Sequence, residues 1–175
     1  MATTITLLTG GGGSGKTHYA LNLAAPASRK AYIATAPTNL DAELDAKIRV
    51  HQGERDASYT TIEEQLQLGD AYRRALDIPC ETILIDCLTL WASNLIFTET
   101  AAEEPLDQFL SALAGTTGRT IIVTNEVSLG VIPADPMTRR YCALLARINR
   151  RVAALADEVV LMVSGIAVPI KGGHR

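Results

Sequence analysis

A glycine-rich stretch near the N-terminus matches the phosphate-binding pattern G-x-x-x-x-G-K-[ST] at every fixed position. It consists of Gly10, Gly11, Gly12, Gly13, Ser14, Gly15, Lys16 and Thr17. The apolar, β-branched run Ile5–Thr9 predicts a buried strand before it, and Thr17–Ala25 predicts a helix after it. Between a strand and a helix, successive backbone N–H groups of such a loop converge on a polyphosphate. Glycine runs also form loops that bind nothing, but this context favours a nucleoside triphosphate site.

Three side chains are expected to organise the phosphates and a Mg²⁺ ion at this loop. Lys16 would reach the terminal phosphates, and the Thr17 hydroxyl would bind Mg²⁺. Asp86 lies in the strand predicted over Thr82–Cys87, at the carboxyl end, where ligands bind in open α/β sheets. An aspartate at this place can also simply begin the next turn. The glycine loop favours the magnesium interpretation.

Apolar strands alternate with helical stretches, which is typical of a mostly parallel sheet with helices on both faces. Strands are predicted over residues 5–9, 31–36, 82–87, 119–124 and 158–164, with a short extended piece over 58–62. Residues 166–171 are expected to fold back as an antiparallel edge strand. Helices are predicted over residues 17–25, 41–52, 65–76, 88–97 and 105–114, and from Pro136 to Leu155. We therefore expect an α/β fold of the P-loop NTPase (RecA-like) class, as one domain over residues 1–175.

The helix predicted from Pro136 is strongly two-faced. Its apolar positions keep helical spacing and are Tyr141, Leu144, Leu145, Ile148, Val152 and Leu155. The opposite face carries Arg139, Arg140, Arg147, Arg150 and Arg151. A charged face of this kind is most often solvated.

Composition excludes some classes of protein. The formal net charge of −3 argues against nucleic-acid binding, which requires a basic surface. The three cysteines are isolated, so neither a disulfide framework nor a zinc site is indicated, and Cys80 and Cys87 are expected to be buried thiols. The chain shows no signal-peptide pattern and no apolar run long enough to span a bilayer, so a cytoplasmic protein is expected.

Four sequence blocks resemble the bifunctional adenosylcobinamide kinase / adenosylcobinamide-phosphate guanylyltransferase family of cobalamin biosynthesis. They read TGGGGSGKT, YIATAPTNLDAELDAKIRVHQGER, LIDCLTLWASNL and VTNEVSLGVIPADPMTRRYCALLARINRRVAALADEVVLMVSGIAVPIK. The blocks follow the family's order and cover most of the chain. The segment DCLTLWASNL of the third block and the segment TNEVSLGVIP of the fourth are far more specific than the glycine loop.

The resemblance implies two successive reactions. A nucleoside triphosphate, ATP or GTP, phosphorylates the aminopropanol hydroxyl of adenosylcobinamide. GMP is then transferred from GTP to that phosphate, which releases pyrophosphate and leaves adenosylcobinamide-GDP. The resemblance also implies a homotrimer with active sites near subunit contacts.

His51 is the position that matches the family's GMP-carrying histidine. A neutral imidazole is a competent nucleophile at pH 7, and a phosphoramidate transfers readily to a phosphate acceptor. His51 also lies beside the apolar stripe of the helix predicted over residues 41–52. By spacing alone, a structural histidine or a cation in the last helical turn is the commoner case.

Further positions match residues that contact guanine nucleotide in the family, namely Ala34, Thr35, Ala36, Gln52, Gly53, Glu54, Arg55 and Glu63. A carboxylate such as Glu63 can accept hydrogen bonds from guanine N1–H and the N2 amino group, although an isolated glutamate is more often solvated. Asn125 and Glu126 end a predicted strand at the same sheet edge, and a substrate or metal contact is expected there.

The chain departs from the family pattern at three places. The family's loop usually reads G-G-A-R-S-G-K-S, whereas Gly12 and Gly13 stand here for alanine and arginine, which removes a charge beside the phosphates. Ser128 stands where glycine is usual. Residues 172–175 form an extension without an evident role.

Three alternative functions remain open at this level. A nucleotide-binding regulator would bind GTP without turning over a corrinoid acceptor. A RecA-like ATPase or motor subunit would need a basic surface, which the net charge disfavours. A family member could also have kept only one of the two activities.

Overall fold

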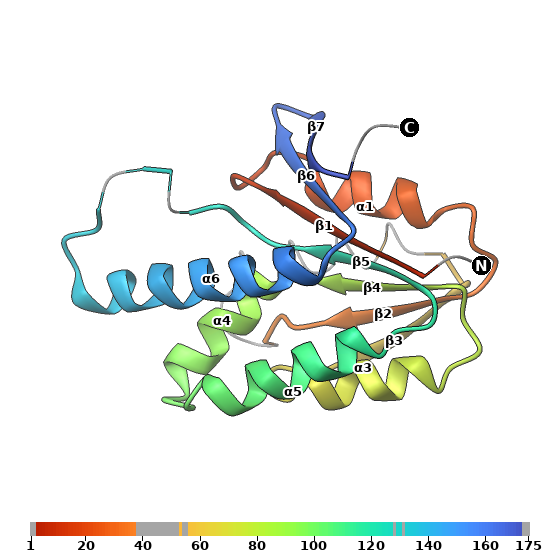
Figure 1. The fold of residues 1–175 in the computed structure, drawn as a ribbon, viewed down its shortest axis with the longest axis horizontal. Coiled ribbons are helices and arrows are strands. Elements are labelled where there is room, and N and C mark those ends of the chain that lie inside the picture. Colours follow the sequence, from red (N-terminus) through yellow and green to blue (C-terminus); the bar gives the residue numbers. More distant parts are fainter. Residues whose placement is uncertain (1–2, 38–52, 54–55, 128, 131, 173–175) are drawn as a thin grey trace.

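The structure, a computed structural model, describes residues 3–37, 53, 56–127, 129–130 and 132–172. The strands in this part of the chain form one seven-stranded sheet in the order β3-β2-β4-β5-β1-β6-β7 (Figure 1). They are β1 (Thr4–Gly10), β2 (Lys30–Ala34), β3 (Tyr59–Glu63), β4 (Thr82–Asp86), β5 (Arg119–Val123), β6 (Glu158–Val163) and β7 (Ile166–Lys171). All neighbouring pairs are parallel except β6 and β7, which confirms the antiparallel edge.

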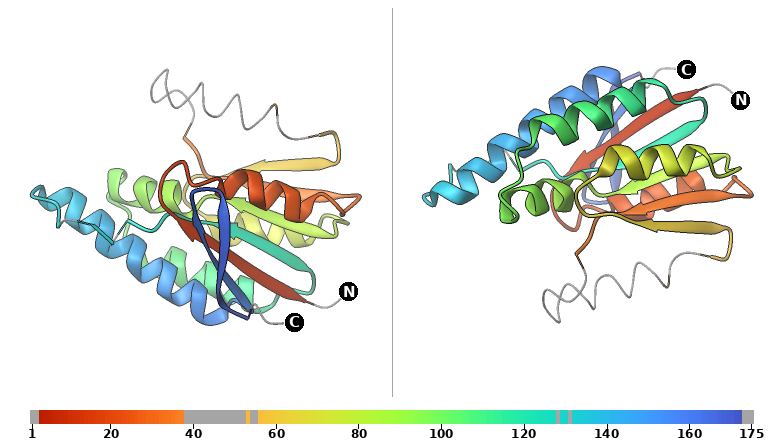
Figure 2. Two further views of the ribbon diagram at one scale, coloured as in Figure 1. Left: turned by 90° about the horizontal axis from the view of Figure 1, so that it is seen from above. Right: turned by 90° about the horizontal axis from the view of Figure 1, so that it is seen from below.

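Helices cover both faces of the sheet unequally (Figure 2). They are α1 (Lys16–Ala24), α3 (Leu68–Leu76), α4 (Leu88–Phe97), α5 (Glu103–Ala114) and α6 (Pro136–Leu155). Helix α1 packs on one face, against a small apolar cluster that includes Leu8, Leu84 and Ile121. The other four helices enclose the larger core on the opposite face. The predicted P-loop NTPase class of α/β fold is confirmed, while the helix predicted over residues 41–52 lies outside the described residues.

Helix α1 begins one residue before its predicted start, and two other helices begin two or three residues from theirs, for local reasons. Helix α3 begins at Leu68 and not at residue 65, because Glu64 Oε1 accepts hydrogen bonds from the backbone N–H groups of Leu66 and Gln67 and holds them in a turn. Helix α5 begins at Glu103, two residues before Pro105. Proline is tolerated in a first helical turn, because the N–H groups there have no carbonyl acceptor within the helix and the missing N–H of proline loses no bond. Acidic residues are favoured at this end by the helix dipole.

A cluster of aromatic side chains fixes α3, α4 and α5 to each other. Trp91 and Tyr72 both contact Phe109 edge-to-face, with ring centroids 5.7 and 6.0 Å apart. Their polar ends are paired, because Trp91 Nε1 donates to the carbonyl of Leu66 and the Tyr72 hydroxyl bonds to Thr120 Oγ1. All three rings are fully buried. This packing fixes the position of α4 relative to the sheet.

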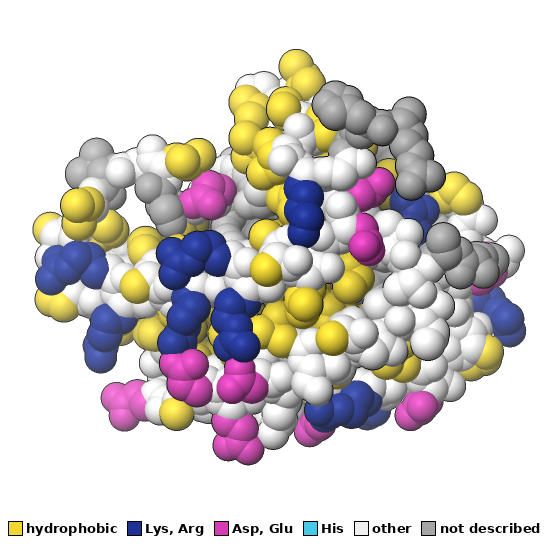
Figure 3. Space-filling model, viewed as in Figure 1, with side chains coloured by type: hydrophobic (Ala, Val, Ile, Leu, Met, Phe, Trp, Pro, Cys, Tyr) yellow, Lys and Arg dark blue, Asp and Glu magenta, His cyan; other side chains and the backbone are white. Residues whose placement is uncertain are grey.

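The basic face of α6 is partly paired. Arg147 and Arg151 form ion pairs with Glu103 and Asp107 of α5, and Figure 3 shows the dark blue side chains of α6 beside the magenta ones of α5. The pairs are exposed, so each contributes little to stability. The three cysteines are half-buried as whole residues, and burial raises the pKa of the Cys80 and Cys87 thiols, the latter to about 12. None of the helices in the described part of the chain combines the length and apolar character that a bilayer-spanning segment requires.

Glycine is required where β1 passes into the loop. Gly10 has φ +146° and lies opposite Met162 of β6, and an added Cβ would overlap the Met162 carbonyl. Gly11 differs, because no heavy atom lies within 4 Å of a Cβ built there. The start of the loop is therefore held by the sheet, whereas the next residue faces open space.

We expect Gly10→Ala to destabilise the fold by about 3 kcal/mol, because β1 and β6 must separate to admit the methyl group. Thermal unfolding should show a midpoint roughly 6–12 °C below that of the unsubstituted protein. Gly11→Ala is the matched control and should shift the midpoint by no more than about 2 °C. Equal midpoints for the two variants would contradict this account of the β1–β6 contact.

Candidate nucleotide site

The glycine loop closes over the N-terminus of α1 in a conformation that depends on left-handed backbone. Gly13 and Gly15 have φ of +70° and +88°. The Ser14 N–H donates to the Gly11 carbonyl at 3.3 Å, and the Ser14 carbonyl accepts from Gly165 in the β6–β7 turn at 3.2 Å. The loop is thus fixed at both its own turn and the neighbouring hairpin.

Gly13 occupies the position where the family resemblance predicts arginine. A Cβ there would meet no atom within 4 Å, so space is not the limit. The left-handed φ of this position is what disfavours other residues, because an L-residue in that conformation costs about 1 kcal/mol or more. Glycine at this position therefore relaxes the loop backbone and removes one positive charge from its rim.

Lys16 is buried within the loop, with 6% of the residue exposed. Its ammonium donates to the carbonyls of Gly10 at 3.0 Å and Gly11 at 2.6 Å, and to Ser14 Oγ at 3.3 Å. Burial lowers the pKa of Lys16, while the nearby Cys87 and Asp86 oppose that shift. A phosphate oxygen entering the loop would compete with these acceptors for the ammonium protons.

Asp86 and Thr17 come together from different elements. The carboxylate Oδ2 of Asp86, at the end of β4, accepts from Thr17 Oγ1 of α1 at 3.2 Å and from the Tyr32 hydroxyl of β2 at 2.9 Å. The sequence predicted the first two residues as metal ligands but missed Tyr32. Strand β2 pairs with β4, and this pairing brings the phenol to the carboxylate.

These oxygens suit Mg²⁺. The ion prefers oxygen ligands and usually keeps several waters, with one or two carboxylates and substrate phosphates completing its shell. The described residues contain no cluster of three or more His, Cys, Asp or Glu side chains that could hold a metal alone. A hydroxyl and a carboxylate beside a phosphate loop therefore fit an ion that is bound together with a nucleotide.

The ends of β2, β3 and β4 lie in one row. Ala34 pairs in register with Glu63 of β3 on one side and with Asp86 of β4 on the other. Glu63 is exposed at this edge, so its carboxylate is open to a ligand. Ala36 is half-buried just beyond β2. The predicted nucleotide contacts of Ala34, Ala36 and Glu63 thus come from the same edge as Asp86.

The hydroxyl and carbonyl groups of Thr35 form hydrogen bonds within the protein. Its hydroxyl donates to the Cys87 carbonyl at 2.7 Å and accepts from the Cys87 N–H at 2.9 Å. Its own carbonyl accepts from Asn94 Nδ2 of α4 at 2.8 Å. Thr35 is fully buried, and it ties the ends of β2 and β4 to α4.

A second polar network continues along the same edge under α4 and α6. Thr124 Oγ1 donates to Asn149 Oδ1 at 2.7 Å, and Asn149 Nδ2 donates to the Asn125 carbonyl at 3.0 Å. The Asn125 N–H donates to Thr89 Oγ1 at 2.8 Å, and the Glu126 N–H donates to the Gly10 carbonyl at 3.0 Å. The end of β5 is therefore fixed to two helices and to the phosphate loop.

Thr9 stands out beside this network. It lies at the end of β1 with 8% of its surface exposed, and its hydroxyl has no hydrogen-bond partner within the described part of the chain. A buried hydroxyl without a partner costs about 1–3 kcal/mol, so such an atom is typical of a place where a ligand or water binds.

Sequence reasoning placed Asn125 and Glu126 at this edge but missed Thr89 and Asn149. Asn149 lies among the arginines of α6 and Thr89 lies in an otherwise apolar helix, so neither residue belongs to a sequence pattern that indicates a site. Four predicted site residues lie outside the described residues, namely His51, Gln52, Glu54 and Arg55. Gly53 is described and exposed.

Comparison with known proteins gives one consistent family. Residues 6–170 match the family model described as cobinamide kinase / cobinamide phosphate guanyltransferase. The chain is 35% identical over 180 residues to the bifunctional adenosylcobalamin biosynthesis protein CobU of Salmonella typhimurium, covering 94% of this chain and 98% of that protein. It is 34% identical over 169 residues to the bifunctional adenosylcobalamin biosynthesis protein CobP of Pseudomonas aeruginosa, with 95% and 96% covered.

Solved structures support the fold alone. The ATPase EscN of the enteropathogenic E. coli type III secretion system superposes with a TM-score of 0.60 at 11% identity, over 92% of this chain and 43% of that one. A KaiC-like protein from Pyrococcus horikoshii OT3 superposes with a TM-score of 0.52 at 15% identity, over 90% and 71% of the two chains.

We expect Thr17→Ala to weaken binding of a Mg²⁺-nucleoside triphosphate about tenfold or more, because the hydroxyl beside Asp86 is lost. Titration with a fluorescent GTP analogue, with Mg²⁺ and with EDTA, measures the effect. Thr17→Ser keeps the hydroxyl and is the matched control, with affinity near that of the unsubstituted protein. The affinities of Thr17→Ala and Thr17→Ser for the GTP analogue should differ in the presence of Mg²⁺ and become equal in EDTA. If the two affinities differ by the same factor under both conditions, Thr17 is not a metal ligand.

Proposed function

The chain belongs to the cobinamide kinase / cobinamide phosphate guanyltransferase family, and from this premise we propose that it carries out two successive transfers in the cytoplasm. A nucleoside triphosphate first phosphorylates the aminopropanol hydroxyl of adenosylcobinamide. GMP then passes from GTP to the new phosphate, giving adenosylcobinamide-GDP and pyrophosphate. The convergence of Lys16, Thr17 and Asp86 at one glycine loop is the observation that carries the proposal.

The phosphate end of the site supports both transfers. The loop N–H groups and the Lys16 ammonium would bind the phosphates, and Thr17 with Asp86 would hold Mg²⁺. That ion would neutralise charge on the phosphates when bound. Tyr32 donates a hydrogen bond to Asp86, which orients the carboxylate toward Thr17. ATP and GTP would both suit this end, because it contacts no base.

The guanine end would lie along the row of strand ends. From β1 to β3 the sheet crosses β5, β4 and β2, which is four strand spacings and about 19 Å. An extended nucleoside triphosphate has a comparable length. With its phosphates on the glycine loop, its base would approach Glu63, whose carboxylate can accept from guanine N1–H and the N2 amino group. Gln52, Gly53, Glu54 and Arg55 complete the proposed guanine-nucleotide contacts.

His51 is the proposed carrier of GMP. A neutral imidazole nitrogen would attack the α-phosphorus of GTP, so that a P–N bond forms and pyrophosphate leaves. A phosphate oxygen of adenosylcobinamide-phosphate would then attack the same phosphorus and release the imidazole. The support for this role is family membership together with the position of His51 in the chain segment between β2 and β3, the two strands whose ends carry Ala34 and Glu63.

A homotrimer is part of the same proposal. The β6–β7 hairpin forms one edge of the sheet and exposes Val163, Ile166 and Ile170. Figure 3 shows hydrophobic side chains gathered over this hairpin. An exposed apolar edge strand of this kind is a surface that a neighbouring subunit would bury.

We expect the unsubstituted protein, given adenosylcobinamide, ATP, GTP and Mg²⁺, to form adenosylcobinamide-GDP, as read by mass spectrometry of the corrinoid. With α-labelled GTP, the protein itself should acquire a label that is labile in acid and stable in base. His51→Ala should lose the label and stop at adenosylcobinamide-phosphate. His18→Ala, which changes an exposed histidine on α1, is the control and should behave as the unsubstituted protein.

Three results would contradict the proposal at different points. Absence of any corrinoid product from the unsubstituted protein would leave a nucleotide-binding regulator as the better description. A normal yield of adenosylcobinamide-GDP from His51→Ala would remove the histidine from the mechanism while keeping both activities. A product that stops at the phosphate in every variant would indicate a member that has kept only the kinase step.

Glu63→Gln should reduce the preference for GTP over ITP about tenfold, because the carboxylate accepts from the N2 amino group that ITP lacks. The ratio of kcat/KM values for the two nucleotides in the guanylyl transfer measures this effect. Glu104→Gln, an exposed carboxylate on α5, serves as the control. If the ratio is the same in Glu63→Gln as in the control, another group reads the base.

A further inference from the structure

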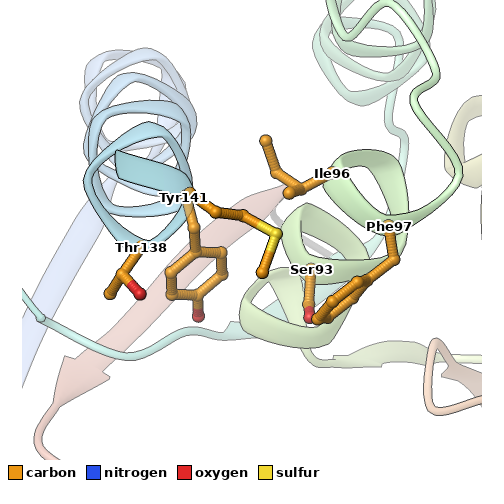
Figure 4. A pocket seen from close by; sticks show the side chains of 6 residues that line it. Ser93, Ile96, Phe97, Thr138 and Tyr141 are labelled. Atoms are coloured by element: carbon orange, nitrogen blue, oxygen red, sulfur yellow. The ribbon is translucent and has the colours of Figure 1, made fainter. Parts of the chain in front are cut away.

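Helices α4 and α6 leave a groove between them at the carboxyl edge of the sheet. It has a volume of about 160 Å³ and is lined by Ser93, Ile96, Phe97, Met137, Thr138 and Tyr141. Figure 4 shows Tyr141 and Thr138 of α6 facing Ser93, Ile96 and Phe97 of α4 across it. Neither the phosphate loop nor the row of strand ends at Glu63 contributes to its walls.

The groove exposes large apolar side chains beside two hydroxyl groups. Phe97 is 69% exposed and Met137 is 42% exposed. The hydroxyls of Tyr141 and Ser93 point toward the same end of the groove (Figure 4). Burial raises the pKa of Tyr141 to about 12, with the nearby thiols of Cys87 and Cys142 adding to the shift, so its hydroxyl is protonated and can donate at neutral pH.

The groove is connected to the phosphate site through the start of α4. Tyr141 lies near enough to Cys87, the residue that directly follows Asp86, for that thiol to add to the raised pKa of the phenol. At 1.5 Å per residue, Ser93 and Phe97 lie about 8 and 14 Å along α4 from its first residue, Leu88. The Ser93 end of the groove is therefore the end nearer to Asp86, about 8 Å along α4 from the helix start.

The chemistry of the lining selects among possible occupants. None of its six side chains is charged, so an ionic group would lose its hydration there without gaining a partner. Apolar side chains with two or three hydroxyls suit a neutral amphipathic molecule that offers methyl and carboxamide groups. The groove is too small to enclose a macrocycle and would grip one edge of it.

We infer that this groove binds the corrin ring of the acceptor, an inference that rests on the proposed function. The reacting hydroxyl of adenosylcobinamide ends an aminopropanol amide arm of seven bonds, which spans roughly 9 Å when extended. With one ring edge against Phe97 and Met137 and the arm leaving the ring beside Ser93, about 8 Å along α4 from Leu88, the hydroxyl at its end reaches the start of α4, next to Asp86. The Tyr141 and Ser93 hydroxyls bond to peripheral carboxamides of the ring.

Phe97→Glu and Met137→Glu test this assignment, because an apolar ring edge that covers the new carboxylate would remove its hydration without giving it a partner. We expect the KM for adenosylcobinamide to rise tenfold or more in each variant. The KM for GTP and the labelling of the protein by GTP should change less than twofold, because the nucleotide lies elsewhere. Leu155→Glu places the same charge on a partly exposed apolar position at the far end of α6 and is the matched control.

Direct binding supplies a second measurement. The only tryptophan, Trp91, lies on α4 between Leu88 and Ser93, and a bound corrin absorbs its emission. Quenching by adenosylcobinamide without nucleotide gives an affinity that does not depend on turnover. Phe97→Glu should weaken it tenfold or more, while thermal unfolding checks that each variant is folded.

The outcomes separate the two proposals. If the unsubstituted protein turns over adenosylcobinamide while Phe97→Glu and Met137→Glu keep its KM, the groove assignment is wrong and the function stands. If these variants change the sedimentation coefficient and keep the KM, the groove is a contact between copies of the chain, and the assignment is equally wrong. Absence of turnover in the unsubstituted protein overturns the proposed function itself.

Discussion

The parallel register of β1, β5 and β4 is the constraint on which the rest of the site depends. Because Leu8, Val123 and Asp86 are aligned across these strands, the glycine loop after β1 and the carboxylate at the end of β4 open on the same edge. Strand β5 lies between them and is fixed to the loop by the bond from Glu126 N–H to the Gly10 carbonyl. A shift of one residue in either pairing would move Asp86 away from Thr17 and turn its side chain to the other face.

Buried polar groups hold this edge in one arrangement. Thr35 links the ends of β2 and β4 to Asn94 of α4, while Asn149 of α6 links Thr124 to Asn125. Each of these bonds satisfies a group that burial would otherwise penalise. The bonds of Asn94 and Asn149 also hold α4 and α6 against the ends of the strands, and the groove lies between these two helices. The helices that line the apolar groove and the strand ends proposed to bind the nucleotide are therefore parts of one hydrogen-bonded edge.

Local patterns predicted most of the elements because each has a strong local cause. Helix α4 was predicted over residues 88–97 and is observed over the same residues, because an apolar helical run follows a buried strand without ambiguity. The β6–β7 edge was also predicted, from two apolar runs separated by Ser164 and Gly165. The start of α3 was wrong, because a side-chain bond from Glu64 competes with the helix and no periodicity reveals such a bond.

The amino-acid sequence by itself determined the phosphate loop, the carboxylate expected to face it and the family, because these depend on residues that are adjacent in the chain or recur in fixed blocks. Tertiary structure alone decided that the Tyr32 phenol bonds to Asp86, that Asn149 holds the end of β5, and that Phe97 and Met137 share a groove. Each of these contacts joins residues dozens of positions apart. They arise from strand order and helix packing, which no local pattern encodes.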